Sequence, residues 1–366
     1  MVLDNRHLLS SLIQDRRVAV ACDPGHDLAP PASGRVDWDR VAGMLLGLAV
    51  GDSLGNTSEG ISPHVRRDLH GEIRDYLPNR YADGRRVGLP SDDTQMAFWT
   101  LEQALRDGGL VPDALARRFA SERIFGMGST VRAFRLAFEQ GEPWQRAGQP
   151  SAGNGALMRI APVLVPHLRE PNSALWADVV LAGMITHNDP ASNAACVGFV
   201  RLLWEALRLD GAPRPGFWLE TFCEVARRVE GDSPLYVPRA PKYAGKKTTL
   251  WSFTGQEVRR ALAARVSALE ACEDWYSGAF LLETVPCVLF ILERHGHDPE
   301  EAIVRAVNDT RDNDTVAAIV GAAVGALHGR QALPARWLEN HLGRTGASDD
   351  GHVDELLRAT RSRLPS

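Results

Sequence analysis

The tetrapeptide Asp312-Asn313-Asp314-Thr315 runs directly into the sequence VAAIVGAAVGAL at residues 316–327. This run has the composition of a helix that is polar on no face, which is typical of a helix buried at the centre of a domain. Its glycines and alanines also favour a close approach by a neighbouring helix. Two carboxylates therefore stand at the entrance of a helix that we expect to be central and buried.

The same helical periodicity extends over most of the chain. Apolar residues recur at intervals of three and four in residues 41–50, 94–107, 113–124, 155–166, 173–187, 191–208, 255–271, 279–295, 300–308 and 315–328. Asp189-Pro190 and Asp298-Pro299 are typical of helix starts. Long alternating strands are scarce, so we expect an all-α fold in which residues 38–366 form one compact helical domain.

The first 37 residues form an extension to this domain. The spacing of Leu8, Leu9, Leu12 and Ile13 predicts one apolar face of a short helix, and residues 24–34 (PGHDLAPPASG) have the composition of a linker. Two interpretations are open: a terminal segment docked on the domain, or an arm that binds a partner.

Composition excludes several classes of protein. The chain has 366 residues, of which 44% are apolar and 24% charged, which is typical of a globular protein. A net charge of -5 argues against a strongly basic nucleic-acid binder, and no apolar run is long enough to span a membrane. The five cysteines are odd in number and form no CxxC pair. That pattern argues against a disulfide scaffold or a zinc knuckle and predicts a cytoplasmic protein.

A second acidic tetrapeptide, Ser91-Asp92-Asp93-Thr94, also stands where a loop enters an apolar helix. Helix capping accounts for one aspartate at each place, but not easily for two at each of two places. Four carboxylates brought together repel one another unless cations neutralise them, and Asp with Ser or Thr hydroxyls suits Mg²⁺. The alternatives are a binuclear metal site that holds a nucleophilic water and two separate helix caps.

Three further motifs carry polar groups at helix ends. Residues 51–60 (GDSLGNTSEG) contain Glu59, which is either an exposed loop carboxylate or a mobile acid at a cleft. Residues 151–159 (SAGNGALMR) form a glycine-rich turn that opens a helix, an arrangement that binds phosphate. His187 lies between two helices and is either a helix C-cap or a ligand-binding residue.

Taken in order, five stretches resemble the ADP-ribosylglycohydrolase family, the enzymes related to dinitrogenase reductase-activating glycohydrolase. They are GMLLGLAVGDSLGNTSEG (43–60), SDDTQMA (91–97), GNGALMRIAPV (153–163), THNDP (186–190) and DTRDNDTVAAIVGAAVGALHG (309–329). The resemblance implies a compact all-α domain around two Mg²⁺ or Mn²⁺ ions. It also implies a hydrolase that removes ADP-ribose from a side chain of a modified protein, with arginine as the favoured linkage.

The resemblance also implies roles for individual residues. The metal ligands would be Ser91, Asp92, Asp93, Asp312, Asp314 and Thr315. The groups near the metals and the scissile bond would be Glu59, Asp92, Asp93 and Asp314. The diphosphate and distal ribose would lie against Ser151, Gly153, Asn154 and Gly155, and His187 would contact the ADP-ribose.

The chain departs from the family pattern at two places. Many members have Gly-Tyr where this chain has Gly278-Ala279, so the aromatic wall of the ligand site would have to come from Tyr276 or Phe280. The extension of residues 1–37 exceeds what the catalytic core needs. The alternative function is therefore an immunity protein whose extension binds and blocks an ADP-ribosyltransferase toxin, with or without hydrolase activity. The long loop at residues 231–253 has no assigned role.

Overall fold

The computed structural model describes residues 4–344 and 352–363. Within these ranges the chain forms helices and a few isolated β-bridges but no strand, so the predicted all-α fold is confirmed. The α-helices are α1 (Asn5–Gln14), α2 (Pro24–Asp27), α3 (Trp38–Gly55), α4 (Pro63–His70), α5 (Asp92–Asp107), α6 (Pro112–Ser121), α7 (Ser129–Glu139), α8 (Trp144–Ala147), α9 (Ala174–Met184), α10 (Pro190–Ala206), α11 (Phe217–Glu230), α12 (Leu250–Ala264), α13 (Ala268–Asp274), α14 (Leu281–His295), α15 (Pro299–Asp309), α16 (Asn313–His328), α17 (Ala335–Glu339) and α18 (His352–Arg363). The 3₁₀ helices are η1 (Asn56–Ser58), η2 (Arg80–Ala82), η3 (Leu157–Arg159), η4 (Ala161–Leu168), η5 (Pro241–Tyr243) and η6 (Arg330–Ala332).

Helices α3 and α16 are in backbone contact along their length. A Cβ added to Gly47 would lie 2.1 Å from the carbonyl oxygen of Gly321, and one added to Gly321 would lie 2.1 Å from the carbonyl oxygen of Gly47. Glycine recurs every fourth residue of α3 and forms one stripe, which faces α16 at 43, 47, 51 and 55. The close approach predicted from the composition of α16 is confirmed, and the glycine spacing of α3 identifies its partner.

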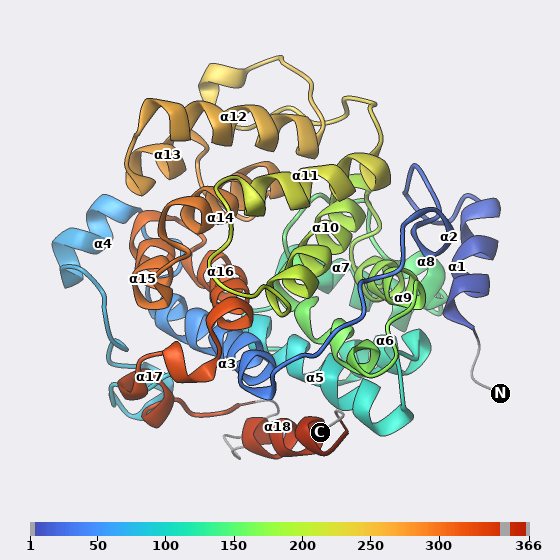
Figure 1. Ribbon diagram of the computed structural model, residues 1–366, viewed down its shortest axis with the longest axis horizontal. Helices are drawn as coiled ribbons and strands as arrows, with labels where there is room; N and C mark the ends of the chain where they lie inside the picture. The colour runs from blue at the N-terminus through green and yellow to red at the C-terminus, as the bar shows by residue number, and fades with distance from the viewer. Residues whose placement is uncertain (1–3, 345–351, 364–366) are drawn as a thin grey trace.

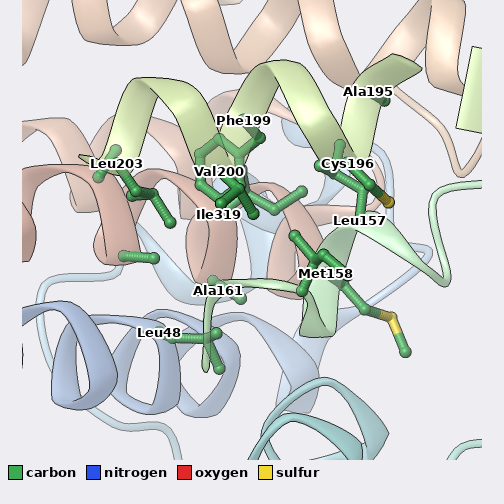
Figure 2. Close-up of a cluster of buried hydrophobic side chains, with 14 of the residues drawn as sticks. Leu48, Leu157, Met158, Ala161, Ala195, Cys196, Phe199, Val200, Leu203 and Ile319 are labelled. Atoms are coloured by element: carbon green, nitrogen blue, oxygen red, sulfur yellow. The ribbon is translucent and has the colours of Figure 1, made fainter. Parts of the chain in front are cut away.

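Helix α16 is enclosed by α3, α10, α14 and α15, as its central place in Figure 1 shows. Figure 2 shows one part of this core, with Ile319 of α16 next to Val200 of α10 and Leu48 of α3 on the opposite side of the same cluster. These three side chains are at most 1% exposed. Because every side of α16 is covered by another element, the helix has no polar face.

Two predicted helices differ from the structure. Residues 155–166 form the 3₁₀ helices η3 and η4 rather than an α-helix, because Pro162 and Pro166 interrupt α-helical hydrogen bonding. Residues 255–271 are divided between α12 and α13. The division falls at Arg265, whose φ of 56° ends α12, and Ser267 then begins α13 with a capping box.

The extension at residues 1–37 packs on the helical body where the structure describes it. Helix α1 lies against α9, and its predicted apolar face joins the core through Leu8, Leu9, Leu12 and Ile13. The indole N–H groups of Trp176 and Trp204 donate to the carbonyl oxygens of Ala29 and Ala32, each at 2.9 Å. The docked interpretation therefore describes this part of the chain in the structure.

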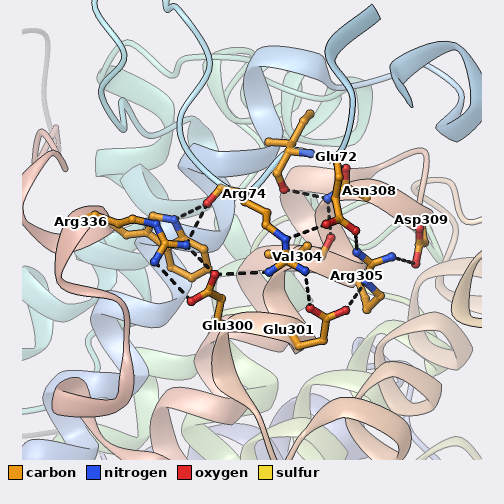
Figure 3. Close-up of polar contacts among 11 residues, drawn as sticks. Glu72, Arg74, Glu300, Glu301, Val304, Arg305, Asn308, Asp309 and Arg336 are labelled. Atoms are coloured by element: carbon orange, nitrogen blue, oxygen red, sulfur yellow. Dashed lines mark hydrogen bonds and ion pairs between the residues drawn. The ribbon is translucent and has the colours of Figure 1, made fainter. Parts of the chain in front are cut away.

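An ionic network joins α15 to α17 and to residues 71–79 (Figure 3). Arg305 of α15 pairs with Glu301 at 2.8 Å and also contacts Glu72, while Arg74 reaches both of these glutamates at 2.7–2.8 Å. Arg336 of α17 joins the network through Glu300. Isolated surface pairs contribute about 0–1 kcal/mol, and a connected set contributes more. The network therefore fastens residues 71–79 and α17 to a helix that packs on α16.

The described helices and cysteines have two further properties. None of the helices that the structure describes combines the length and the hydropathy needed to cross a bilayer. All five cysteines are free thiols, as predicted, and four of them are buried.

We predict that Gly47→Ala destabilises the protein by about 3 kcal/mol or prevents folding, because the new methyl group overpacks the contact between α3 and α16. The measurement is urea unfolding followed by far-UV circular dichroism. Gly34→Ala is the matched control, since its Cβ would meet only the flexible Arg208 side chain at 3.8 Å. Equal stability of the two variants would contradict the proposed role of the glycine stripe.

Candidate active site

Three helix ends meet at one place. The last turn of α3 touches the first turn of α16, because a Cβ on Gly55 would lie 2.4 Å from the Asp314 Cα. Ser91 is the N-cap of α5, and Asp312 is the N-cap of α16. The two acidic tetrapeptides, far apart in the sequence, are therefore neighbours in space.

Asp52 joins the two tetrapeptides and was not predicted from the sequence as a site residue. It is fully buried in α3. It accepts hydrogen bonds from the hydroxyl groups of Ser91 at 2.8 Å and Thr94 at 2.6 Å, and from the backbone N–H groups of both residues. The available signal was that Asp52 is the only charged residue in the glycine-rich stretch 41–55. Asp52 thus holds the start of α5 against α3 and orients the two aspartates that follow Ser91.

Two groups of carboxylates have the spacing of a cation site. Oxygens of Asp52, Asp93 and Asp314 lie within 4.8 Å of one another, and so do oxygens of Glu59, Asp312 and Asp314. The two groups share Asp314. The buried Oδ1 atom of Asp93 has no hydrogen-bond partner among the described residues, and an oxygen-only donor set suits a hard divalent cation. The residues therefore fit a divalent metal ion.

Electrostatic repulsion within the cluster agrees with that fit. Burial raises the pKa values of Asp92, Asp93 and Asp314 well above their usual range, and the neighbouring carboxylates raise them further. The pKa of Asp312 is raised by burial as well, although hydrogen bonds with Asn154 and Asp314 oppose the shift. A bound cation would remove this conflict by favouring the charged carboxylates.

Glu59 stands at the solvent-facing rim of the cluster, just after η1. Burial of its carboxyl group, with contributions from Asp312 and Asp52, raises its pKa to about 7. A carboxyl group with that pKa exchanges protons near neutral pH. Glu59 is exposed and also lines the cavity, so the structure shows features of both interpretations from sequence.

The glycine-rich turn at residues 151–155 forms the facing wall. The Asn154 side chain donates to Asp312 at 2.5 Å and to Thr284 at 3.0 Å, and its backbone N–H donates to the carbonyl oxygen of Ala279. All three N–H groups of Asn154 are therefore engaged within the protein. In this structure Asn154 orients a carboxylate of the cluster, while the Gly153 N–H makes a 3.3 Å contact with the Ser151 hydroxyl.

His187 explains why this turn carries glycines. A Cβ at Gly155 would lie 2.8 Å from His187 Cε1, and one at Gly153 would lie 3.4 Å from His187 Nε2. Burial and the nearby Arg159 lower the histidine pKa to about 3. The ring is therefore neutral near pH 7, and its Nδ1 lies 2.8 Å from the Thr186 hydroxyl. His187 is a support for the glycine turn and also faces the cleft.

These walls enclose a cavity of about 510 Å³, within the usual range for small-molecule sites. All the predicted site residues line it except Ser91, which lies behind Asp93: Glu59, Asp92, Asp93, Ser151, Gly153, Asn154, Gly155, His187, Asp312, Asp314 and Thr315. Sequence reasoning did not find Arg239, which also lines the cavity. Phe280 lines it too, whereas Tyr276 lies outside the lining and is 45% exposed.

Comparisons with known proteins identify the family and the fold of the chain. The profile of the ADP-ribosylglycohydrolase family matches residues 33–364. ADP-ribosylarginine hydrolase Tri1 of Pseudomonas putida is 28% identical over 89% of this chain and 79% of its own length. ADP-ribosylhydrolase ARH3 of Xenopus tropicalis is 26% identical over 88% of this chain and 96% of its own. A solved "ADP-ribosylglycohydrolase-related protein complex" is 27% identical, with a TM-score of 0.63 over 90% of this chain and 99% of its own.

The carboxylate cluster predicts a pH-dependent stability. Carboxyl groups whose pKa is raised by folding stabilise the folded state below about pH 4, and this contribution is lost as pH rises through their folded pKa values. Without metal, Tm should therefore fall between about pH 5 and 8, since the folded pKa of Glu59 is about 7. Mn²⁺ at 100 times its Kd should restore about 2.7 kcal/mol.

Differential scanning calorimetry with Mn²⁺ or with a chelator measures this effect. The difference in Tm between the two conditions should grow with pH. Asp314→Asn should remove most of the difference, because Asp314 belongs to both carboxylate groups. A Tm that does not respond to Mn²⁺ at pH 8 would refute the metal assignment.

Proposed function

The chain belongs to the ADP-ribosylglycohydrolase family, and on this basis we propose that it is a metal-dependent hydrolase that releases ADP-ribose from a modified arginine. The observation that carries the proposal is the buried carboxylate cluster facing the glycine turn across one cavity. The cluster suits cations that bind a ribose diol, and the glycines of the turn allow a ligand to approach its backbone closely.

Two groups of carboxylates, Asp52–Asp93–Asp314 and Glu59–Asp312–Asp314, would together hold two divalent cations, Mg²⁺ or Mn²⁺. When bound, such cations supply Lewis-acid contacts to sugar hydroxyls and lower the pKa of a water molecule. The remaining negative charge of Asp92 and Asp93 faces the cavity and would stabilise positive charge that develops at the anomeric carbon. Electrostatic stabilisation of this kind commonly contributes more to catalysis than any other single effect.

Proton transfer falls to Glu59 in this proposal. Its pKa of about 7 allows both the protonated and the ionised form near neutral pH. At the cavity rim it would exchange a proton with the attacking water or the leaving group. Ser151, Gly153 and Gly155 would carry the diphosphate, and neutral His187 would keep their turn in place.

The arginine linkage is the finer part of the proposal. One relative is named for ADP-ribosylarginine, whereas the other name specifies no side chain. The modified protein would be the substrate, and a carbohydrate–nitrogen bond would be cleaved. The proposed location is the cytoplasm, in agreement with free thiols and with the absence of a membrane-crossing helix among those described.

The immunity alternative requires residues 1–37 to reach a toxin. The described part of that extension packs on α9, and Trp176 and Trp204 hold its backbone. No observation therefore favours a toxin-binding arm over the hydrolase, and we propose the hydrolase function alone.

We predict that the protein releases ADP-ribose from an arginine-ADP-ribosylated protein in the presence of Mg²⁺ or Mn²⁺, and that a chelator abolishes release. Chromatography of the released ADP-ribose, with serine-linked substrate in parallel, measures both the reaction and its linkage. Release from the serine-linked protein alone would refute the arginine preference. Release that survives chelation would refute metal dependence.

Substitutions test the assigned groups in the same assay. Asp92→Ala combined with Asp314→Ala should lower turnover at least about 100-fold, and Glu59→Gln should lower it about 100-fold or more if it transfers the proton. Glu139→Gln, at an exposed position at the end of α7, is the matched control and should stay within about twofold. Intact turnover in the aspartate double variant would show that the site is assigned to the wrong residues.

A further inference from the structure

One cationic residue stands out in the cavity. Arg239 is the only lysine or arginine among the described residues that line it, whereas five lining residues are carboxylates. It comes from the loop between α11 and α12, to which the sequence assigned no role. One arginine among five carboxylates in the cavity lining suggests that the arginine has a specific role.

A buried partner fixes the Arg239 guanidinium. Its Nε and Nη2 atoms donate to the two Glu283 oxygens, each at 2.6 Å. The Glu283 side chain is 1% exposed, in the first turn of α14, and also accepts the Gly278 N–H. The paired-fork geometry orients the guanidinium plane more firmly than a single contact would. Arg239 is thus held in place although 55% of its side chain is exposed.

Two aromatic rings lie near the Arg239 guanidinium. Its central carbon lies 5.3 Å from the centre of the Phe280 ring and 5.7 Å from that of Tyr276, distances at which cation–π attraction contributes. The pair with Glu283 uses one edge of the guanidinium. The Nη1 atom has no hydrogen-bond acceptor among the residues that the structure describes, so it is available to a ligand.

The unpaired Nη1 edge of the Arg239 guanidinium lies near the glycine turn at residues 151–155. Phe280, under the guanidinium, is paired with Gly153 in an isolated antiparallel bridge. The N–H groups of Asn154 in the same turn are already engaged. The turn alone therefore offers few donors for two phosphate charges, and the nearest fixed positive charge on the cavity wall is Arg239.

We propose that Arg239 binds the diphosphate of the ligand and that Glu283 acts as its positioning residue. This inference rests on the proposed function, because it deepens the assignment of ADP-ribose to this cavity. The carboxylates would bind the ribose of the ligand through cations. Arg239 would bind the phosphate end of the same ligand. A ligand with a diol at one end and phosphate at the other is thereby oriented in one direction.

The loop that carries Arg239 is fastened at other points, so its position does not depend on this residue alone. The Tyr236 hydroxyl donates to Asp189 at 2.7 Å, and the backbones of Tyr236 and Thr248 are paired. Glu230 accepts the first N–H groups of α12. A conservative change at Arg239 should therefore leave the loop in place.

Titration calorimetry of ADP-ribose in the presence of Mn²⁺ tests the proposal. Arg239→Gln should raise the Kd for ADP-ribose about 10- to 100-fold, and Arg239→Lys should raise it less. The affinity of wild type should weaken as salt rises from about 50 to about 300 mM, and Arg239→Gln should weaken less steeply. Arg260→Gln is the matched control, since Arg260 is 53% exposed and paired with Glu257 but lies outside the cavity lining.

A double-mutant cycle separates positioning from structure. Glu283→Gln should weaken ADP-ribose binding in wild type but cause no further loss in Arg239→Gln, whereas independent structural effects would add. The affinity for Mn²⁺ alone should stay within about threefold in every variant.

Three results would overturn the proposal: unchanged ADP-ribose affinity in Arg239→Gln, loss of Mn²⁺ binding in parallel with ADP-ribose binding, or additive effects in the cycle. Failure of the proposed function is distinguishable from these. A wild-type chain that binds ADP-ribose but releases none refutes hydrolysis and leaves the Arg239 binding test decisive. A wild-type chain that does not bind ADP-ribose refutes both.

Discussion

The backbone contact between α3 and α16 is the constraint on which the rest of the structure depends. Because glycine removes the side chains between the two helices, Asp52 near the end of one can share a cation-sized space with Asp314 at the start of the other. Any wider separation would part these carboxylates. The same contact places α16 at the centre, where the surrounding helices bury its apolar sides. Core packing and site geometry are therefore two consequences of one stripe of small residues.

The buried carboxylates of the site lower the stability of the folded protein, whereas the apolar core raises it. Several carboxylates are buried at helix ends, and burial makes their charged forms unfavourable. Helix N-termini and the hydrogen bonds to Asp52 offset part of this penalty, and cations would offset more. The buried Oδ1 atom of Asp93 has no hydrogen-bond partner among the described residues, so it is available to a cation. That combination is typical of functional sites, where local strain and charge are retained by a rigid surrounding fold.

The helical class was predictable because its periodic signals are local, whereas the set of site residues came from the resemblance of five ordered motifs to one family. Asp92 and Asp314 stand next to apolar periodic segments, and the glycines at 153 and 155 mark a turn. Asp52 was missed because a helix interior gives no sign that it reaches a distant loop. Arg239 was missed because one arginine among many, on a long loop, has no local distinguishing pattern. The proline-containing residues 155–166 misled the helix prediction, since periodicity outweighed the effect of Pro162 and Pro166.

In the proposal, two parts of the cavity wall contact the ligand: the carboxylate cluster and the Arg239 guanidinium, which Glu283 holds. Asn154 connects them: its side chain holds Asp312 of the cluster, and its backbone is paired with Ala279, next to the Phe280 ring that underlies Arg239. Neutral His187 keeps the intervening turn in place without adding a third charge. A ligand that satisfies both parts must carry cation-binding oxygens and an anion at a fixed separation. Recognition in this fold would therefore follow from the spacing of charge between two rigid walls rather than from the shape of either wall alone.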